Sequence, residues 1–421
     1  MTFGSRGEIP GCEIPGYEIR GRKIAHRVHH VGKWAAGLLL LVALASCQSA
    51  NLGAATDGIG NDANAIILDP NPQGEVFGQG NVRIALLVPK TAPGNAATVA
   101  NDLRNGALLA MQDFGQNTIQ LVIKDTKGTA ADTQNAATEA INEGSTAILG
   151  PLFSGSVSSA SAVTIPAGRT MIAFSNDPGV AKRGVYLMSY TQVADTRRMM
   201  TYALSLGKRN IHAFLPAGPV GVLQEAALRE IGGAGGINIQ ISKYERSGQA
   251  IEQAARDAVV ALEGADSIYI PEGGQIPEVI LGSLQRSGAA LAGKQVFGSG
   301  QWESVRFGRP ELEGALYTGR DITNFNAFAN RYQSVHNAQP GVFAGLAYDA
   351  VTLVINLVRS KGPQQAFTPA VLEDRRGFAG INGIFRLKQD GTAERGLAIY
   401  KVVNGQGTLE SPAPTSFSAG L

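Results

Sequence analysis

The chain has 421 residues, of which 44% are hydrophobic and 17% charged, and its net charge at pH 7 is +2. The first 46 residues carry six Lys or Arg and three Glu, so the chain that follows them has a net charge of −1. The basic excess therefore belongs to the first 46 residues, and the rest of the chain gives no indication of binding to nucleic acid or another polyanion. Its two cysteines are Cys12 and Cys47, which leaves no pair for a disulfide after residue 46.

An apolar run of about a dozen residues, Trp34–Ala45, marks the N-terminal segment. This run is too short to span a bilayer, which takes roughly 20 residues. Basic residues precede it and the small residues Ala45 and Ser46 follow it, which is the order found in a cleaved export signal. A buried helix is the alternative. We predict that residues 1–46 are a lipoprotein signal peptide.

The residues Leu44–Cys47 resemble the lipobox of bacterial lipoproteins. This resemblance implies that the Cys47 thiol is acylated and that more than one acyl chain makes a lasting anchor. Gln48, in place of an aspartate, implies sorting to the outer membrane. The expected location is therefore the periplasm, with a lipid anchor in the outer membrane. Residues 47–81 are rich in Gly, Asn, Asp and Ala and are predicted to form a flexible tether.

Strands and helices alternate from residue 82 onwards. Near-continuous apolar strands are separated by segments whose hydrophobic residues recur every three to four positions, which is typical of helices. This alternation predicts a parallel sheet covered by helices on both faces. The strands of the first series are predicted at VRIALLVP (82–89), IQLVIKD (119–125), TAILGP (146–151) and MIAFSND (171–177).

A second series begins after a crossing segment near Tyr190–Ala194. Its strands are predicted at NIHAFLP (210–216), INIQISKYE (237–245), SIYIPE (267–272) and QVFGSG (295–300). The predicted fold is α/β, with two doubly wound Rossmann-like lobes and a cleft between them that closes by a hinge motion. The predicted parts are lobe 1 at 82–190 plus 320–383, lobe 2 at 191–319 plus 384–404, and a loose C-terminal tail at 405–421.

Catalytic patterns are weak in this chain. His, Glu and Cys do not cluster at metal-ligand spacing, and the G-x-S-x-G motif of serine hydrolases is absent. Ser205–Lys208 matches S-x-x-K, but Gly207 marks a helix end and no K-T-G partner occurs. Gly288–Lys294 resembles a phosphate-binding loop, yet Gln295 replaces the required Ser or Thr. We therefore predict a protein that is not an enzyme and needs no cofactor or metal.

Binding is better supported by the segment ILGPLFSGSVSSA. It places Ser154, Gly155 and Ser156 between a strand and a helix, where free backbone N–H groups and hydroxyls suit a carboxylate or another anionic or carbonyl group. The alternative is that Ser154 or Ser156 only caps the helix. Ser175 and Asn176 end the next strand, and we expect them beside the serine-rich turn.

Three residues of the second series complete the predicted ligand site. Trp302 follows a strand and either stacks on a ligand or wedges a loop in place. Glu272 ends one predicted strand and Gln301 follows the next, so we expect both at the same cleft.

Several segments together resemble the type I periplasmic binding proteins of the leucine/isoleucine/valine-binding group. They include VRIALLVP, NGALLAMQDF, LVIKDTKGTAADTQNAATEAINEGSTAILGPLFSGSV, AYDAV and FRLKQDGTAERGLAIYKVVNG. The resemblance covers residues 82–404 and implies two Rossmann-like lobes, joined by three crossings, that close on a ligand. It also implies that Ser154 receives the ligand's carboxylate.

The predicted amino-acid site departs from the pattern of that group. Val220 stands where a ligand-stacking tyrosine is expected, and Gly300 or Gln301 replaces the acidic residue that holds the α-ammonium group. An ammonium group buried without such a carboxylate would be costly. Ordinary uptake of branched-chain amino acids is therefore not the first function predicted.

Together with the lipobox, these departures resemble a lipoprotein branch of the same fold that activates penicillin-binding proteins from the outer membrane. The predicted function is a lipid-anchored regulator of peptidoglycan synthesis, whose partner is a peptidoglycan synthase (a penicillin-binding protein). The alternative is the solute-binding receptor of an ABC transporter for amino acids or a related small polar ligand, with an ABC permease as partner. No nucleic-acid partner is expected in either case.

Overall fold

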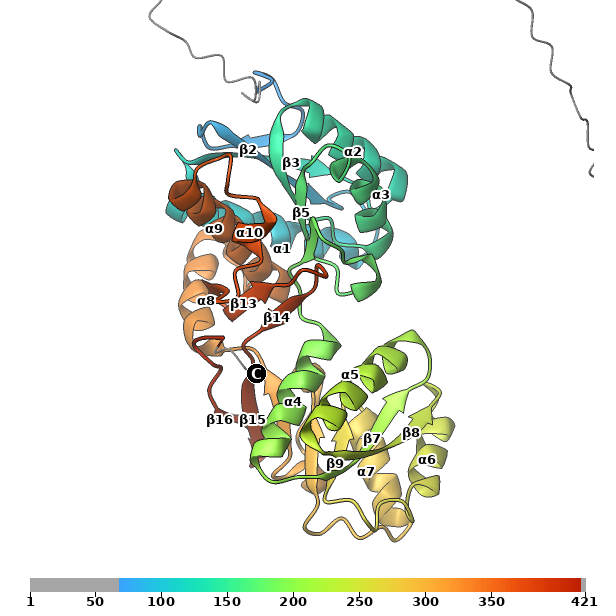
Figure 1. Cartoon of the computed structure of the whole chain (residues 1–421). Helices are drawn as coiled ribbons and strands as arrows, with labels where there is room; N and C mark the ends of the chain where they lie inside the picture. Colours follow the sequence, from blue (N-terminus) through green and yellow to red (C-terminus); the bar gives the residue numbers. More distant parts are fainter. Residues whose placement is uncertain (1–67, 418–421) are drawn as a thin grey trace, which may run out of the picture. The chain divides into compact units, whose positions relative to one another are not determined.

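The computed structural model describes residues 68–417, which form two α/β lobes and a small third sheet (Figure 1). The predicted fold class is confirmed, because each lobe has a largely parallel sheet between helices. The predicted signal peptide, Cys47 and the first part of the predicted tether lie outside the described residues. The lipid anchor therefore stays a prediction from the sequence.

The first sheet has six strands: β1 (Glu75–Phe77), β2 (Val82–Val88), β3 (Ile119–Asp125), β4 (Ser145–Leu149), β5 (Thr170–Ala173) and β6 (Val185–Leu187). Their order is β1-β3-β2-β4-β5-β6. All neighbours run parallel except β1, which is antiparallel to β3. Every side chain of β2 is buried, as a central strand covered on both faces requires.

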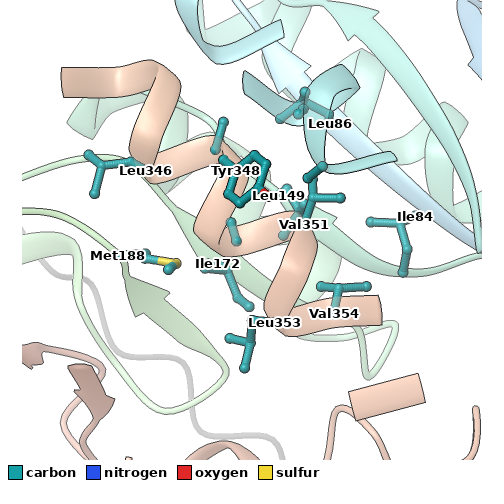
Figure 2. Packing of buried hydrophobic residues seen from close by; sticks show 14 of the residues in the cluster. Ile84, Leu86, Leu149, Ile172, Met188, Leu346, Tyr348, Val351, Leu353 and Val354 are labelled. Atoms are coloured by element: carbon teal, nitrogen blue, oxygen red, sulfur yellow. The ribbon is translucent and has the colours of Figure 1, made fainter. Parts of the chain in front are cut away.

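Six helices belong to the first lobe: α1 (Asn95–Ala110, extended by a π-helical turn at Met111–Gly115), α2 (Ala130–Asn142), α3 (Ser154–Thr164), α8 (Ile322–His336), α9 (Val342–Lys361) and α10 (Pro369–Leu372). Successive side chains of β2 point to opposite faces of the sheet, as in any strand. Ile84 and Leu86 pack with α1 and α9, whereas Ala85 packs with α2 and α3. Figure 2 shows Val351 and Val354 of α9 in the same cluster as Ile84 and Leu86.

Helix α9 is the central helix of the first lobe. By length and composition this helix could cross a membrane, but 72% of its most apolar 18-residue stretch is buried inside the protein. Its close contact with α1 depends on Gly106, because a Cβ atom there would lie 2.0 Å from the carbonyl oxygen of Ala344. Burial and this close packing show that α9 is a core helix of the lobe.

The second sheet has seven strands: β7 (Asn210–Pro216), β8 (Asn238–Tyr244), β9 (Ser267–Ile270), β10 (Gln295–Gly298), β11 (Leu316–Gly319), β15 (Ala398–Val403) and β16 (Gln406–Ser411). Their order is β16-β15-β11-β10-β9-β7-β8, and the strands from β7 to β11 run parallel. Four helices cover it: α4 (Gln192–Ser205), α5 (Pro219–Gly235), α6 (Gly248–Asp257) and α7 (Ile276–Arg286). Helices α4 and α5 pack together, as do α6 and α7.

A third, antiparallel sheet belongs to the first lobe, which places the boundary between the lobes later in the chain than predicted. It consists of β12 (Phe378–Gly380), β13 (Gly383–Leu387) and β14 (Ala393–Arg395). Phe385, Leu387 and Ala393 are buried in the same core as α9. The assignment of residues 384–404 to lobe 2 is therefore wrong for residues 384–395, because alternate side chains of β13 bury against the first lobe.

Three crossing segments join the lobes: one between β6 and α4, one between β11 and α8, and one between β14 and β15. Hydrogen bonds connect residues of these segments to one another or to the neighbouring helices and strands. Arg395 Nε donates to Ser189 O at 3.2 Å, Arg198 Nε to Leu397 O at 2.8 Å, and the Tyr400 hydroxyl to Arg320 O at 2.8 Å. The three-crossing hinge of the predicted fold class is thus present.

The predicted loose tail begins with a strand. Residues Gln406–Ser411 form β16, which pairs antiparallel with β15. Most of its side chains are exposed, so the backbone ladder rather than apolar burial holds it in place. The prediction of a loose segment from residue 405 is therefore wrong for β16.

The part of the predicted tether that begins at Asp69 is held by hydrogen bonds to the first lobe. Arg83 Nη2 donates to Asp69 O at 2.7 Å, and Lys124 Nζ donates to Gln73 O at 2.7 Å. Glu143 receives the backbone N–H of Gln73 at 2.8 Å and forms a buried ion pair with Lys124. The prediction of a flexible tether up to residue 81 is wrong here, because buried charged side chains hold a segment that is itself poorly hydrophobic.

Candidate functional site

The loops after β4 and β5 form one wall of a candidate site. Parallel strands end at a common sheet edge, and that edge is where α/β sheets bind ligands. The turn after β4 needs glycine at Gly150, which has φ of +80° and where a Cβ atom would lie 2.3 Å from Leu87 O. Helix α3 begins directly after this turn, with Phe153 at the N-cap position and without a side-chain cap. Neither Ser154 nor Ser156 caps the helix, so that alternative is wrong.

Cavity 1 lies at the start of α3 and has a volume of about 480 Å³. Ser154, Ser175 and Asn176 supply polar groups to its lining. Three aromatic side chains also line it, namely Phe153, Phe174 and Phe343. The backbone N–H groups of the first helical turn have no partner within the helix. Cavity 1 therefore offers hydrogen-bond donors at one place and apolar walls at another.

Cavity 2 has a volume of about 280 Å³ and includes residues of both lobes. Asn176 of the first lobe lines it as well as cavity 1, so the two cavities share a wall. Asp195, Gly300, Gln301 and Glu303 of the second lobe also line it. Four of the predicted site residues, Ser154, Ser175, Asn176 and Gln301, thus line one cavity or both.

Two residues of the predicted serine-rich turn do not line these cavities. Ser156 is buried, and its hydroxyl bonds the hydroxyl of Thr133 at 3.0 Å. This bond ties α3 to α2, because Ser156 lies on the face of the helix that packs against its neighbour. Gly155 is exposed at the start of α3, outside the lining of either cavity.

Glu272 has a structural partner set instead of a place in a cavity. Its carboxylate accepts the Tyr244 hydroxyl at 2.8 Å and Arg246 Nη2 at 2.7 Å. The side chain is buried, and both of its oxygens are used. Glu272 therefore pairs with Arg246 just after β8 and lines neither cavity, and its contact with a ligand stays a prediction from the sequence.

Trp302 also lies outside both cavities. Its side chain has no exposed area, and Nε1 donates to Ile270 O at 2.8 Å. The indole stacks on Tyr317 with ring centroids 6.2 Å apart. A buried ring cannot stack on a ligand, so the wedge alternative holds. Trp302 fixes the 3₁₀ helix Gly300–Ser304, which carries cavity-lining residues.

Asp195 lines cavity 2 but was not among the site residues predicted from the sequence. It lies in the first turn of α4, where an acid is an ordinary feature of a helix start. Its Oδ1 atom accepts the backbone N–H of Gly300 at 3.0 Å and the Thr318 hydroxyl at 2.5 Å. Burial raises the pKa of Asp195 to about 6, although these two hydrogen bonds lower it, and the nearby Glu303 raises it further.

Two oppositely charged side chains that line cavity 2, Arg320 and Glu303, form an ion pair with each other. Arg320 Nη2 contacts Glu303 at 2.9 Å, and the guanidinium lies over the ring of Phe325 at 5.1 Å. Burial also raises the pKa of Tyr190 well above its usual value, which keeps that phenol neutral. Within residues 68–417 no group of three His, Cys, Asp or Glu side chains is arranged to hold a metal ion.

Residues 81–407 match the family described as periplasmic binding protein. No curated protein matches the chain. A putative branched-chain amino acid ABC transporter structure from Rhodospirillum rubrum is 18% identical, with a TM-score of 0.67, and covers 78% of this chain and 99% of its own.

Two structures with bound small molecules are similar in fold. A substrate-binding protein from Desulfitobacterium hafniense in complex with leucine is 18% identical, with a TM-score of 0.57, and covers 79% of this chain and 100% of its own. A solute-binding protein from Rhodopseudomonas palustris BisB5 in complex with 3,4-dihydroxybenzoic acid is 18% identical, with a TM-score of 0.55, and covers 80% and 97%. At such identities the likeness shows the fold alone.

Proposed function

Because this chain belongs to the periplasmic binding protein family, as the match over residues 81–407 shows, we propose that it is the solute-binding receptor of an ABC transporter. Its solute would be an amino acid or a related small polar molecule. The partner would be the permease of that transporter, and the place of action the periplasm.

The observation that carries this proposal is the shared wall of the two cavities at Asn176. Cavity 1 is lined by the first lobe, whereas cavity 2 includes residues of both lobes. A small solute that fills both would contact both lobes and favour the state in which they enclose it. Solute binding would thereby be coupled to the three-crossing hinge.

The chemistry of cavity 1 suits a solute with an acceptor group and an apolar body. The N–H groups at the start of α3 and the Ser154 hydroxyl can donate to a carboxylate. Phe153, Phe174 and Phe343 offer apolar area to the rest of the molecule. Leucine and 3,4-dihydroxybenzoic acid, the molecules bound in the two similar structures, both have a carboxylate beside an apolar part.

The comparisons favour the receptor over the first predicted function, an activator of peptidoglycan synthases, because the similar structures named above are ABC-transporter proteins. The activator function remains a prediction from the sequence. The two functions differ in what they require of the cavities, since only a receptor needs to bind a small solute tightly.

Filling the shared wall is expected to abolish solute binding. Asn176 is exposed, so an Asn176→Trp variant places an indole into both cavities at little cost to folding. The measurement is a thermal-shift screen of the purified full chain against amino acids and small carboxylates. A solute at 100 times its Kd stabilises the wild type by about 2.7 kcal/mol, and we expect no shift in the variant.

The matched control is Asn356→Trp, at an exposed position of α9 that lines neither cavity. This control should keep the wild-type shift. A solute that stabilises Asn176→Trp as strongly as the wild type would place the binding site elsewhere, and a wild type that responds to no solute would refute the receptor function.

A further inference from the structure

A further cavity, cavity 3, lies on the first lobe and has a volume of about 720 Å³. It is bounded by the turn after α10, by the end of β13 with the turn that follows it, and by the ring of Phe417. None of its lining residues belongs to cavity 1 or cavity 2. Cavity 3 is therefore separate from the site proposed for the solute. Its charged lining residues are Glu373, Arg375, Arg376, Arg386 and Lys388.

The lining of cavity 3 thus carries four positive side chains and one negative one. The chain after residue 46 has a net charge of −1, so this positive charge is a local concentration. The one acid, Glu373, already has partners: it accepts the Tyr186 hydroxyl at 2.8 Å and pairs with Arg183 at 3.0 Å. Its side chain is only 7% exposed. Glu373 therefore does not neutralise the cations that line the cavity.

Arg375 is the cation that is free to bind a ligand. It is exposed, and within residues 68–417 its guanidinium forms no hydrogen bond and no ion pair. Arg376 and Lys388 pair with acids outside the lining, Asp374 at 2.7 Å and Asp390 at 3.2 Å, and both cations are exposed. Exposed pairs of this kind are weak in water, so a bound anion can share these two cations.

Arg386 and Phe417 form a fixed wall of cavity 3. Arg386 Nη2 pairs with Glu394 at 2.7 Å, and its guanidinium lies 4.7 Å from the centroid of the Phe417 ring. Phe417 packs on Gly377, which has φ of +71° and where a Cβ atom would lie 2.9 Å from the ring. Arg386 Nη1 also donates to Arg375 O at 3.2 Å. This bond fixes the turn that carries the free guanidinium.

We propose that cavity 3 binds an anion with a phosphate group, independently of the solute of cavities 1 and 2. Arginine presents its N–H groups in a planar fork that matches the oxygens of a phosphate, and lysine adds a point charge. A phosphate monoester carries a charge of about −1.5 to −2 at pH 7, so it offsets the positive lining better than a single carboxylate does. Two sources have this chemistry, a soluble phosphate monoester and a lipid headgroup.

The first experiment titrates soluble probes calorimetrically into the purified full chain at low salt. The probes are inorganic phosphate, glycerol 3-phosphate and, as an uncharged reference, glycerol. We expect both phosphates to bind and glycerol not to bind. Added sodium chloride should weaken the binding, because salt screens charges at an exposed site. In Arg375→Gln, an exposed position where the change costs little stability, affinity for both phosphates should fall about 10-fold, as the loss of a charged hydrogen bond predicts.

The second experiment distinguishes the two sources of the phosphate. Vesicles that contain phosphatidic acid, whose headgroup is the same phosphate monoester, are sedimented with the full chain, and phosphatidylcholine vesicles are the reference. Cosedimentation that depends on phosphatidic acid and is lost in Arg375→Gln would assign the anion to a lipid headgroup. Binding of glycerol 3-phosphate without such cosedimentation would assign it to a soluble ester.

The control variant is Arg309→Gln, at a side chain that is 66% exposed and lines none of the three cavities. It should bind both phosphates like the wild type. A wild type that binds neither the soluble phosphates nor the phosphatidic acid vesicles would overturn the proposal, and so would an Arg375→Gln variant that binds them as tightly as the wild type. Neither result bears on the receptor function, which is tested at Asn176.

Discussion

Replacing Lys124 by methionine is expected to destabilise the protein by about 3–5 kcal/mol, the cost of leaving a buried charge without its partner. Lys124 and Glu143 form an ion pair at 2.9 Å with side chains only 3% and 6% exposed. Lys124 also donates to Gln73 O, so the substitution additionally releases the segment that leads into β1. Urea unfolding, followed by circular dichroism, measures the change.

The matched control for this experiment is Lys127→Met, just after the same strand. Lys127 pairs with Asp132 at 3.0 Å, but its side chain is 61% exposed. Exposed pairs contribute roughly 0–1 kcal/mol, so this variant should unfold almost like the wild type. If Lys124→Met proved as stable as Lys127→Met, the buried charges would not be what holds residues 69–77 on the first lobe.

Replacing Trp302 by alanine is expected to cost about 3–5 kcal/mol as well, because a large buried ring leaves a cavity that the loop cannot fill. The ring packs directly on Gly298, where a Cβ atom would lie 2.3 Å from the indole. Its loss frees Ile270 O from its hydrogen bond and loosens the 3₁₀ helix Gly300–Ser304. Binding of a solute in cavity 2 should weaken together with stability.

A conservative variant separates packing from the hydrogen bond. Trp302→Phe keeps a ring against Tyr317 but leaves Ile270 O unpaired, so it should lie between the wild type and Trp302→Ala in unfolding free energy. Val260→Ala, at a residue that is 76% exposed, should change the free energy of unfolding by no more than about 0.5 kcal/mol. If Trp302→Ala proved as stable as Val260→Ala, the buried indole would not be what holds the 3₁₀ helix Gly300–Ser304 in place.

The two lobes are predictable from sequence because their central strands carry a strong local signal. Val82–Val88 is apolar except for Arg83, a pattern that favours a strand covered on both faces. Strand β16 has no such signal, since its side chains are mostly exposed and its backbone ladder depends on β15. Residues 69–77 are likewise held by Arg83, Lys124 and Glu143, side chains that read from sequence as ordinary surface charges.

The candidate site is predictable only in part, for a similar reason. Ser154, Ser175 and Asn176 follow strands of one sheet, so topology alone brings them together. Asp195 acquires its place through Gly300, which is 105 residues further along the chain. The family resemblance implies that Gly300 or Gln301 stands in place of an acidic residue, but it does not indicate that a carboxylate from α4 lies against that loop.

The most direct test of the central claim, that a solute bridges both lobes at cavities 1 and 2, is amide hydrogen exchange of the full chain with and without a solute found in the screen. We predict that the solute slows exchange at the start of α3, at residues 174–177 and in the 3₁₀ helix Gly300–Ser304 together. Protection confined to one lobe, or located away from all three segments, would contradict a solute enclosed between the two.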